Sequence, residues 1–393
     1  MSNFSYYTPT HVYFGRGTQN QVGALVRAQG CKKVLIHYGG QSARRSGLLA
    51  QVEASLDAAG VAHVQLGGVV PNPHLSLVYE GIELCRREGV DFILAVGGGS
   101  VIDSAKAIGY GMCMDGDVWE LYNHTRRATG CLPIGVILTI AASGSEMSDS
   151  SVITKEEGGI KRGYNDDICR PKFAIMNPEL TMTLPDYQTA CGCTDILMHT
   201  MERYFVQGSA MEITDSIAEA LMRTVMKQAK ILRDDPKNYD ARAEVMWAGS
   251  LSHNGLTGCG HDGSDFASHR LEHEMGGMFD VAHGAGLAAV WGSWARYVYQ
   301  NCMPRFVRFA RNVMGVEAEL SDDAAALRGI ELMEDFFRSI HMPTCFSELG
   351  IHPTQEQLEE MAHKCYLAVG GLLGSAKKLD EGDMLAIYKM ANH

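Results

Sequence analysis

Short apolar runs alternate with helical patterns through the first half of the chain, and this alternation limits the possible fold more than any other feature. Apolar runs of five or six residues separated by helices indicate βαβ units. We therefore predict a parallel sheet with helices on its faces. The predicted strands are 34–38, 62–66, 92–96 and 133–138, and the predicted helices are 42–59, 75–88 and one that starts at 101.

The pattern changes after Pro185. From Tyr187 to the end the chain shows long helical periods, such as 216–232, and little that indicates a strand. A chain of 393 residues is also long enough for two domains. The sequence predicts a dinucleotide-type α/β domain over residues 1–186 and an all-helical domain over 187–393.

Composition and charge exclude several classes of protein. The net charge of -12 argues against a nucleic-acid partner or an anionic membrane, because phosphate groups attract basic surfaces. No apolar run approaches the roughly 18–20 residues of a membrane helix, and the N-terminal residues do not resemble a signal peptide. Eleven cysteines, an odd number without paired spacing, favour reduced thiols. We expect a soluble, cytoplasmic protein.

A glycine-rich turn follows the predicted strand 92–96. It reads Gly97-Gly98-Gly99-Ser100-Val-Ile-Asp103 and opens a helix. Glycines allow a diphosphate to approach the backbone, and a helix N-terminus offers free N–H groups and partial positive charge. The other interpretation is a tight turn with Ser100 and Asp103 as a capping box. The strand and helix on either side favour anion binding.

A second turn follows the strand 34–38 and reads Tyr38-Gly39-Gly40-Gln41-Ser42. In common NAD-binding folds a carboxylate near a strand end binds the ribose 2′-hydroxyl. Here two glycines and a serine stand in the turn, and Arg44 and Arg45 follow. This combination tolerates a 2′-phosphate, so the sequence favours NADP(H) over NAD(H).

The helical half contains a candidate metal site. Asp195 and His199 are four residues apart and share one face of a helix, and His269 and His273 do the same. His283 follows after a Gly-Gly break. One carboxylate with three imidazoles would suit Fe²⁺ or Zn²⁺ and could leave a position open for substrate.

Together these residues resemble the iron-containing (group III) alcohol dehydrogenases, and especially their NADPH-dependent butanol dehydrogenase and aldehyde reductase branch. The similarity runs nearly end to end, and the Gly-Gly-Gly-Ser-x-x-Asp element and the His-x₃-His-x₉-His spacing are its most specific parts. The matching segments are Pro9–Gly15, Tyr38–Ser42, Val70–Pro73, Gly97–Lys106, Ser143–Glu146, Ser252–Gly255 and 268–284.

The resemblance implies a dehydroquinate synthase-like fold, with an N-terminal dinucleotide domain, a C-terminal helical metal domain and catalysis in the cleft between them. It implies a homodimer formed partly through N-terminal strands. It also implies that His273 is a non-ligand histidine near the reacting centre, where it is a candidate proton relay. The implied metal ligands are Asp195, His199, His269 and His283. The implied cofactor contacts are Gly39, Gly40, Ser42, Asn72, Gly98, Gly99, Ser100, Asp103, Thr139 and Lys161.

Two positions depart from the family pattern. Ile140 stands where many relatives carry a second hydroxyl residue, and Ser148 stands where close relatives often have Asn. The expected activity is hydride transfer between NADP(H) and a primary alcohol or aldehyde. The residues around the histidine segment favour a medium-sized apolar substrate such as butanal; they are Met275, Met278, Phe279 and Trp291.

Other activities stay open. Within the family these are a diol or lactaldehyde reductase with NAD(H), or a polyol dehydrogenase. A dehydroquinate synthase-like lyase would need several basic residues in the metal domain, but residues 246–290 contain only Arg270. A metal-dependent hydrolase would need a base such as Glu272 or Glu274, and it would leave both glycine turns unexplained.

Overall fold

The chain divides into two compact units, and the computed structural model describes all residues 1–393. One unit is Thr8–Thr183, and the other is Leu184–His393 together with Met1–Tyr7. The first residues join the helical unit, where Ser2 N donates to Gly260 O at 3.0 Å. The prediction had assigned them to the α/β domain, because so short a segment has no periodicity that shows where it packs.

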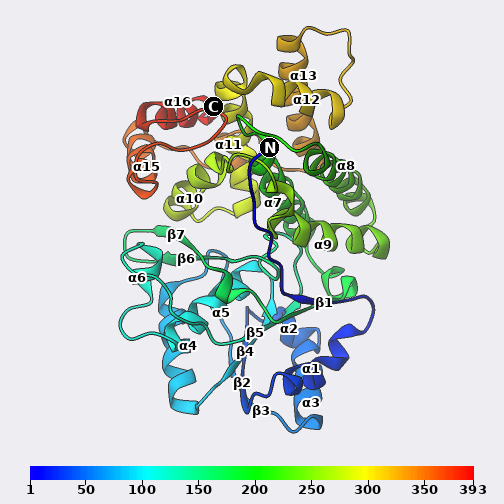
Figure 1. Cartoon of the computed structure of the whole chain (residues 1–393), viewed down its shortest axis with the longest axis vertical. Helices are drawn as coiled ribbons and strands as arrows, with labels where there is room; N and C mark the ends of the chain where they lie inside the picture. Colours follow the sequence, from blue (N-terminus) through cyan, green and yellow to red (C-terminus); the bar gives the residue numbers. More distant parts are fainter. The chain divides into compact units, whose positions relative to one another are not determined.

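The unit Thr8–Thr183 is built on a six-stranded sheet in the order β1-β8-β5-β4-β2-β3, in which every neighbouring pair is parallel (Figure 1). The predicted parallel α/β fold is therefore confirmed. The strands of the sheet are β1 (His11–Phe14), β2 (Lys33–Tyr38), β3 (Ala62–Leu66), β4 (Phe92–Gly97), β5 (Ile134–Leu138) and β8 (Phe173–Met176). The helices of this unit are α1 (Val22–Ala28), α2 (Ser42–Arg45), α3 (Leu48–Ala58), α4 (Leu75–Glu88), α5 (Gly99–Met112) and α6 (Trp119–Tyr122).

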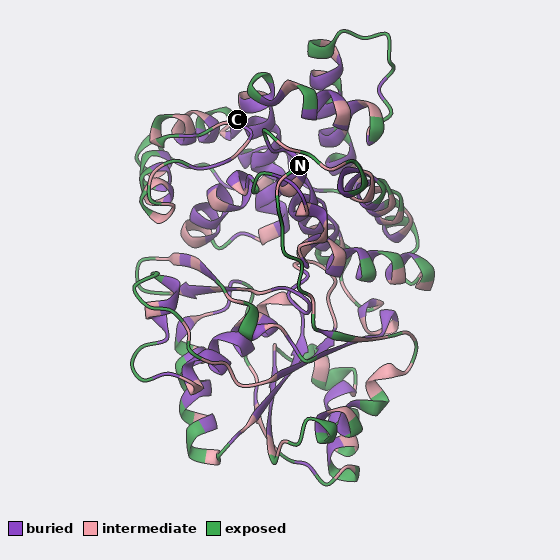
Figure 2. Ribbon diagram, viewed as in Figure 1, coloured by how far each residue is buried: buried purple, intermediate pink, exposed green.

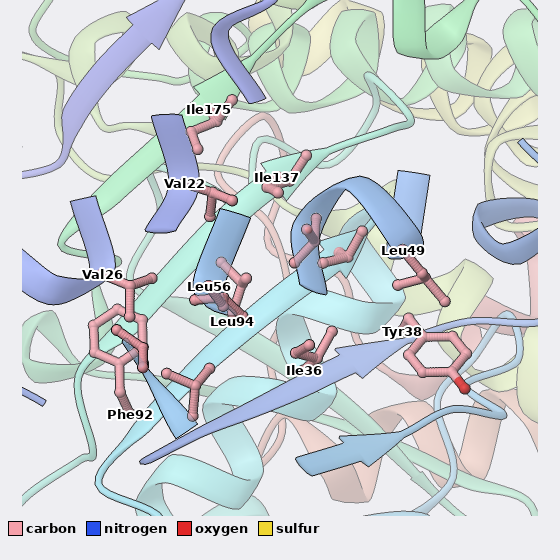
Figure 3. Packing of buried hydrophobic residues seen from close by; sticks show 14 of the residues in the cluster. Val22, Val26, Ile36, Tyr38, Leu49, Leu56, Phe92, Leu94, Ile137 and Ile175 are labelled. Carbon is pink, nitrogen blue, oxygen red and sulfur yellow. The ribbon is translucent and has the colours of Figure 1, made fainter. Parts of the chain in front are cut away.

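The central strands are buried on both faces, which explains their continuous apolar sequences. On one face, side chains of α1 and α3 such as Val26 and Leu56 pack against Ile36 and Leu94 of the sheet (Figure 3). On the other face α5 packs against β4 and β5, and α4 packs against α5. Figure 2 shows buried residues along the strands and exposed residues on the outer surfaces of the helices.

The strand order reverses between β2 and β4. The chain leaves β2 toward β3 at one edge and then returns to β4 on the opposite side of β2. Tyr38 at the end of β2 pairs in register with Val96 of β4, so both glycine turns lie at the same edge of the sheet. In open α/β sheets, ligands bind outside the carboxyl ends of the strands at this kind of switch point.

Three details of this unit differ from the sequence pattern. The helix expected over 42–59 is two helices, because Gly47 between α2 and α3 has a φ of 79°. The short strands β1 and β8 were not predicted. Neither was the antiparallel hairpin of β6 (Ser150–Lys155) and β7 (Ile160–Asn165).

The other unit is helical, as predicted. Its central helix α7 packs against α8, α9, α10 and α11. No helix of the chain is both long and apolar enough to cross a membrane. Its helices are α7 (Asp186–Tyr204), α8 (Glu212–Asp234), α9 (Tyr239–His253), α10 (Ala267–Phe279), α11 (His283–Val298), α12 (Met303–Asn312), α13 (Asp322–Ser339), α14 (Phe346–Leu349), α15 (Gln355–Ala368) and α16 (Glu381–Ala391).

Candidate metal centre and cofactor edge

The predicted metal ligands come from three helices of the helical unit. Asp195 and His199 lie one turn apart on α7, and His269 lies in the first turn of α10. The α10 helix ends at Phe279, the next residue Asp280 turns the chain with a φ of 50°, and His283 is the first residue of α11. The turn at Asp280 thus returns the chain to the cluster, which the Gly-Gly break in the sequence only suggested.

These side chains meet around one carboxylate oxygen. Asp195 Oδ1 lies 3.1 Å from His199 Nδ1, 3.5 Å from His269 Nε2 and 3.7 Å from His283 Nε2. Asp195, His199 and His269 each offer a ligand atom, and these atoms lie within 4.8 Å of one another. The structure therefore brings all four predicted ligands together.

The donor set fits a divalent metal ion. Asp195 Oδ1 and His269 Nε2 are buried, yet neither atom has a hydrogen-bond partner. Buried polar atoms without partners are costly, and their presence in a native fold requires an explanation. A carboxylate and imidazoles are ligands that Fe²⁺ and Zn²⁺ accept, so a metal would satisfy both atoms.

Two buried glutamates orient the histidines. Glu202 pairs with His269 Nδ1, and its other oxygen accepts from the His269 backbone N–H at 3.0 Å. Glu272 pairs with His283 Nδ1. Each carboxylate occupies the Nδ1 side and leaves Nε2 for the centre, which is the usual arrangement behind metal-binding histidines. Glu272 is thus engaged in orienting a histidine, unlike the general base that a hydrolase would need.

The carboxylates also set the charge of the cluster. Burial alone would lower the pKa of His269, but Glu202 and Asp195 raise it to about 9. Burial would raise the pKa of Asp195, but the neighbouring histidines hold it well below its usual value. Burial lowers the pKa of His199 to about 4, although Asp195 opposes this shift. Glu202 and Asp195 thus favour the protonated form of His269 when no metal is bound.

Three further residues surround the cluster and were not predicted to belong to it. The ring of His253, at the end of α9, lies edge-on to His199 with centroids 4.0 Å apart. Phe266 lies 5.4 Å from the His269 ring, and the guanidinium of Arg203 lies over Phe266 at 4.9 Å. Arg203 Nη1 also donates to His199 O at 2.8 Å. The spacing to His253 is too long for any local pattern to reveal this contact.

His273 lies beside the ligand set. It is buried one turn after His269 on α10, and its ring centroid lies 6.5 Å from that of His269 and 6.0 Å from that of His283. His273 therefore lies next to the cluster, and its role as a non-ligand histidine stays a prediction.

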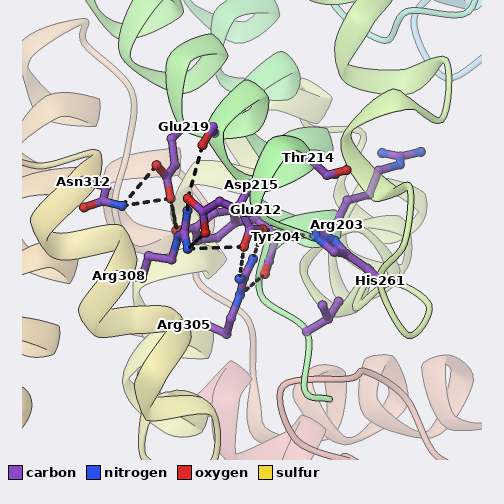
Figure 4. Close-up of polar contacts among 12 residues, drawn as sticks. Arg203, Tyr204, Glu212, Thr214, Asp215, Glu219, His261, Arg305, Arg308 and Asn312 are labelled. Atoms are coloured by element: carbon purple, nitrogen blue, oxygen red, sulfur yellow. Dashed lines mark hydrogen bonds and ion pairs between the residues drawn. The ribbon is translucent and has the colours of Figure 1, made fainter. Parts of the chain in front are cut away.

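A buried ionic network supports the same helices farther from the cluster (Figure 4). Arg305 of α12 makes two hydrogen bonds of 2.6 Å to Asp215 of α8. His261 lies 3.1 Å from the same carboxylate through Nε2, and its Nδ1 bonds to Arg203 O. The network thereby links α8 and α12 to the C-terminal end of α7.

Most of the predicted cofactor residues follow the carboxyl ends of the strands of the sheet. Gly39, Gly40 and Ser42 follow β2, and Gly98, Gly99 and Ser100 follow β4. Thr139 follows β5, and its backbone N–H donates to Gly97 O at 3.0 Å. Asn72 lies between β3 and α4 with a φ of 54°. Lys161 on β7 is opposite Thr154, whose N–H donates to Pro73 O and so links the hairpin to the Asn72 loop.

The turn before α5 has no side-chain cap and is tightly packed against the neighbouring loop. Gly98 is the N-cap of α5, and no side chain caps this helix. The capping box considered for Ser100 and Asp103 is therefore absent. A Cβ at Gly99 would lie 2.2 Å from Ser143 Oγ, and one at Gly98 would lie 2.9 Å from Ile140 Cβ. These glycines are therefore needed for packing against Ile140 and Ser143.

Asp103 faces the protein. Its Oδ1 accepts from Ser145 Oγ at 2.6 Å, and its Oδ2 accepts from Val152 N at 3.0 Å. One turn later, the buried Lys106 donates to the carbonyl oxygens of Ser145, Ser148 and Ser150. Both side chains fix the loop after β5, so the Asp103 carboxylate bonds to the protein itself, and its predicted contact with a cofactor stays a prediction.

A parallel sheet with glycine turns at its switch point, together with a separate carboxylate–histidine cluster, defines a class of metal-dependent dinucleotide oxidoreductase. The family model described as iron-containing alcohol dehydrogenase matches residues 9–178. The model described as the C-terminal part of the Fe-containing alcohol dehydrogenase family matches residues 189–392. The chain belongs to the iron-containing alcohol dehydrogenase family.

Individual relatives agree with this assignment. The chain is 38% identical to NADH-dependent butanol dehydrogenase A of Clostridium acetobutylicum over 99% of each chain. It is 34% identical to the NADPH-dependent aldehyde reductase YqhD of Escherichia coli over 89% of this chain and 90% of that one. The crystal structure of NADH-dependent butanol dehydrogenase A from Thermotoga maritima superposes with a TM-score of 0.96, at 37% identity over 100% of this chain and 99% of that one.

The chain is therefore an alcohol dehydrogenase or aldehyde reductase that uses a nicotinamide cofactor and a divalent metal. The predicted family, fold and enzyme class are confirmed. The relatives include both NADH- and NADPH-dependent enzymes, so the comparisons do not establish which of the two cofactors this chain prefers.

Proposed function

We propose that the enzyme transfers a hydride between NADP(H) and a primary alcohol or aldehyde of the size of butanol or butanal. The cofactor preference rests on the turn after β2, where no carboxylate stands to bind a ribose 2′-hydroxyl and repel a 2′-phosphate. Gly39 and Gly40 occupy this turn, and no atom lies within 4 Å of the position a Cβ would take at Gly40. The open space and the absence of negative charge support NADP(H).

The metal site carries the proposed chemistry. Asp195, His199, His269 and His283 would hold Fe²⁺, or Zn²⁺ in its place. Such an ion stabilises negative charge on a substrate oxygen and lowers the pKa of a bound hydroxyl. The protein binds the ion, orients the imidazoles through Glu202 and Glu272, and positions the cofactor.

His273 is the proposed proton relay. An alcohol must lose a proton when its hydride leaves, and a carbonyl oxygen must gain one in the reverse direction. An imidazole exchanges protons readily near neutral pH. His273 is buried on α10, one turn from His269. This position supports proton transfer between an imidazole nitrogen of His273 and the substrate oxygen.

Fewer residues support an apolar substrate than the sequence pattern indicated. Met275 and Trp291 are fully buried and serve as core residues. Met278 and Phe279, at the end of α10, are half-buried and stay available to contact a substrate. The butanol dehydrogenases among the relatives support the same substrate class.

A substrate panel tests this proposal. The metal-loaded enzyme should reduce butanal with NADPH at a higher kcat/KM than it reduces lactaldehyde or a short hydroxyaldehyde. A higher kcat/KM for the hydroxylated substrates with NADH would instead support the diol or lactaldehyde reductase. Absence of turnover with any aldehyde in the presence of Fe²⁺ and of Zn²⁺ would refute the activity.

We also propose a cytoplasmic homodimer. Strand β1 lies at the edge of the sheet, so one side of its backbone is open for pairing. Light scattering coupled to size-exclusion chromatography should give twice the chain mass of 42.9 kDa. A monomeric mass at micromolar concentration would contradict the dimer.

A further inference from the structure

Two side chains of the sheet, Tyr38 and Gln65, hold an arginine in place beside the turn that follows β2. Arg44 lies on the short helix α2, and its Nε donates to Tyr38 Oη at 3.0 Å. Its Nη2 donates to the same oxygen and to Gln65 Oε1, the latter at 2.9 Å. The guanidinium also lies over the Tyr38 ring at 5.1 Å from the centroid. An exposed arginine is usually free to move, but this one is fixed along one edge.

The residues that hold Arg44 are themselves fixed. Tyr38 is the last residue of β2 and is buried, and its ring lies so close to Gly67 that a Cβ there would come within 2.4 Å of it. Gln65 on β3 donates through Nε2 to the carboxylate of Glu53. A carboxylate only accepts hydrogen bonds. Glu53 therefore fixes the amide of Gln65 with its nitrogen toward α3 and its oxygen toward Arg44.

The position and chemistry of this arginine match a specific part of the cofactor. Tyr38 is followed directly by Gly39 at the switch point, where the strand next to the glycine-rich turn meets the adenosine ribose in doubly wound folds. With Nε and Nη2 engaged, Arg44 has Nη1 left without a hydrogen-bond partner. The free Nη1 of a guanidinium can donate a charge-assisted hydrogen bond to a phosphate dianion.

We propose that Tyr38 and Gln65 hold Arg44 as the specificity-determining residue for the 2′-phosphate of NADP(H). This inference rests on the proposed cofactor preference and assigns it to one side chain. Arg45, the next residue, makes no side-chain hydrogen bond or ion pair, so it is a matched control. Gln65 and Tyr38 act through Arg44 and are positioning residues.

The experiment compares two fragments of the cofactors, 2′,5′-ADP from NADP(H) and 5′-AMP from NAD(H), which differ only in the 2′-phosphate. The dissociation constants of 2′,5′-ADP and 5′-AMP are measured by calorimetry on the full-length protein and on R44M, R45M, Q65M and R44K. R44M should weaken 2′,5′-ADP about tenfold and leave 5′-AMP unchanged, because one charge-assisted contact is lost. Q65M should weaken 2′,5′-ADP severalfold. R45M should change neither constant more than about twofold.

R44K and thermal unfolding separate recognition from folding. R44K keeps the charge but loses the fork that Tyr38 and Gln65 hold, so its affinity for 2′,5′-ADP should fall between those of the wild type and R44M. Melting temperatures should be similar for all variants. Equal losses for both fragments, or an R45M variant as weak as R44M, would overturn the role of Arg44.

The results also distinguish this inference from the proposed function. If the wild type prefers 2′,5′-ADP and R44M keeps that preference in full, the role of Arg44 is wrong and the NADP(H) preference stands. If the wild type binds both fragments equally and turns over faster with NADH, the proposed cofactor preference is wrong and the role of Arg44 falls with it.

Discussion

Substitution of Glu202 by Gln should weaken the metal site without removing a ligand. One oxygen of Glu202 accepts from the His269 backbone N–H at 3.0 Å, and the other pairs with His269 Nδ1. An amide can serve only one of these two donors, so its NH₂ group must face the other. Loss of one hydrogen bond to a charged group costs about 1.5–3 kcal/mol. This corresponds to a metal affinity lower by about 10–100-fold.

The pH dependence of the metal affinity gives an independent test of the interaction between Glu202 and His269. Metal binding requires a free His269 Nε2, and Glu202 and Asp195 raise the pKa of His269 to about 9 in spite of burial. The affinity of the wild type should therefore increase as the pH rises toward about 9. In E202Q the pKa of His269 should be lower, so the affinity should level off at a lower pH. The same raised pKa stabilises the metal-free fold below pH 6.5, and this stability is lost as the pH rises through about 9.

Competition with a chromogenic chelator measures the affinity, using Zn²⁺ or Fe²⁺ under anaerobic conditions between pH 6 and pH 9.5. E334Q is the control, because Glu334 is a buried carboxylate of the same unit that pairs with Arg296. E334Q should keep the metal affinity of the wild type. Wild-type affinity in E202Q, or an equal loss in E334Q, would refute the orienting role of Glu202.

Three further predictions concern the cofactor, the ionic network and the proton relay. Gly39→Asp should shift the preference from NADPH toward NADH by about tenfold or more, because the new carboxylate would repel a 2′-phosphate. A Cβ at Gly39 would lie 3.4 Å from Val69 O and therefore fits. The ratio of kcat/KM with NADPH to kcat/KM with NADH measures the shift, and an unchanged ratio would contradict it. Asp215→Asn should lower the free energy of unfolding, measured in urea, by about 3–5 kcal/mol, because Arg305 would be left buried without its partner. The control Asp322→Asn, at an exposed ion pair, should lower it by less than about 1 kcal/mol. Burial would raise the pKa of Asp215, but Arg305 lowers it, so this stability is present above about pH 4 and lost at lower pH; a difference between variant and wild type that is the same at pH 3 and pH 7 would contradict this cause. His273→Gln should lower kcat by about 10²-fold with little change in metal affinity, and an unchanged pH–rate profile would exclude the relay.

Much of the fold could be predicted because burial on both faces leaves a clear pattern. Strands β2, β4 and β5 are almost entirely buried, and their apolar runs end at glycine turns or loops. The edge strand β1 has only four residues, all at least partly exposed, so it has no comparable signal. Strand β8 is buried but equally short.

The residues of the candidate metal site could be predicted to the extent that they repeat within a helix. Asp195 and His199 share a face of α7 at i and i+4, and Glu202 continues the same face at i+7. That spacing could have identified Glu202 from the sequence. The contact of His253 with His199 depends on how α9 packs against α7, which no local spacing encodes. The arrangement of Arg44 depends likewise on the pairing of β2 with β3.

We expect a metal held by the histidine cluster to be required for hydride transfer with NADPH. The most direct test is the rate of NADPH oxidation with butanal, measured on chelator-treated protein before and after addition of Fe²⁺ or Zn²⁺. We expect little turnover without metal, recovery when metal is added, and no recovery in H269A, although this variant should still bind NADPH. Equal turnover in metal-free H269A, or no turnover in the reloaded wild type with either cofactor, would contradict it.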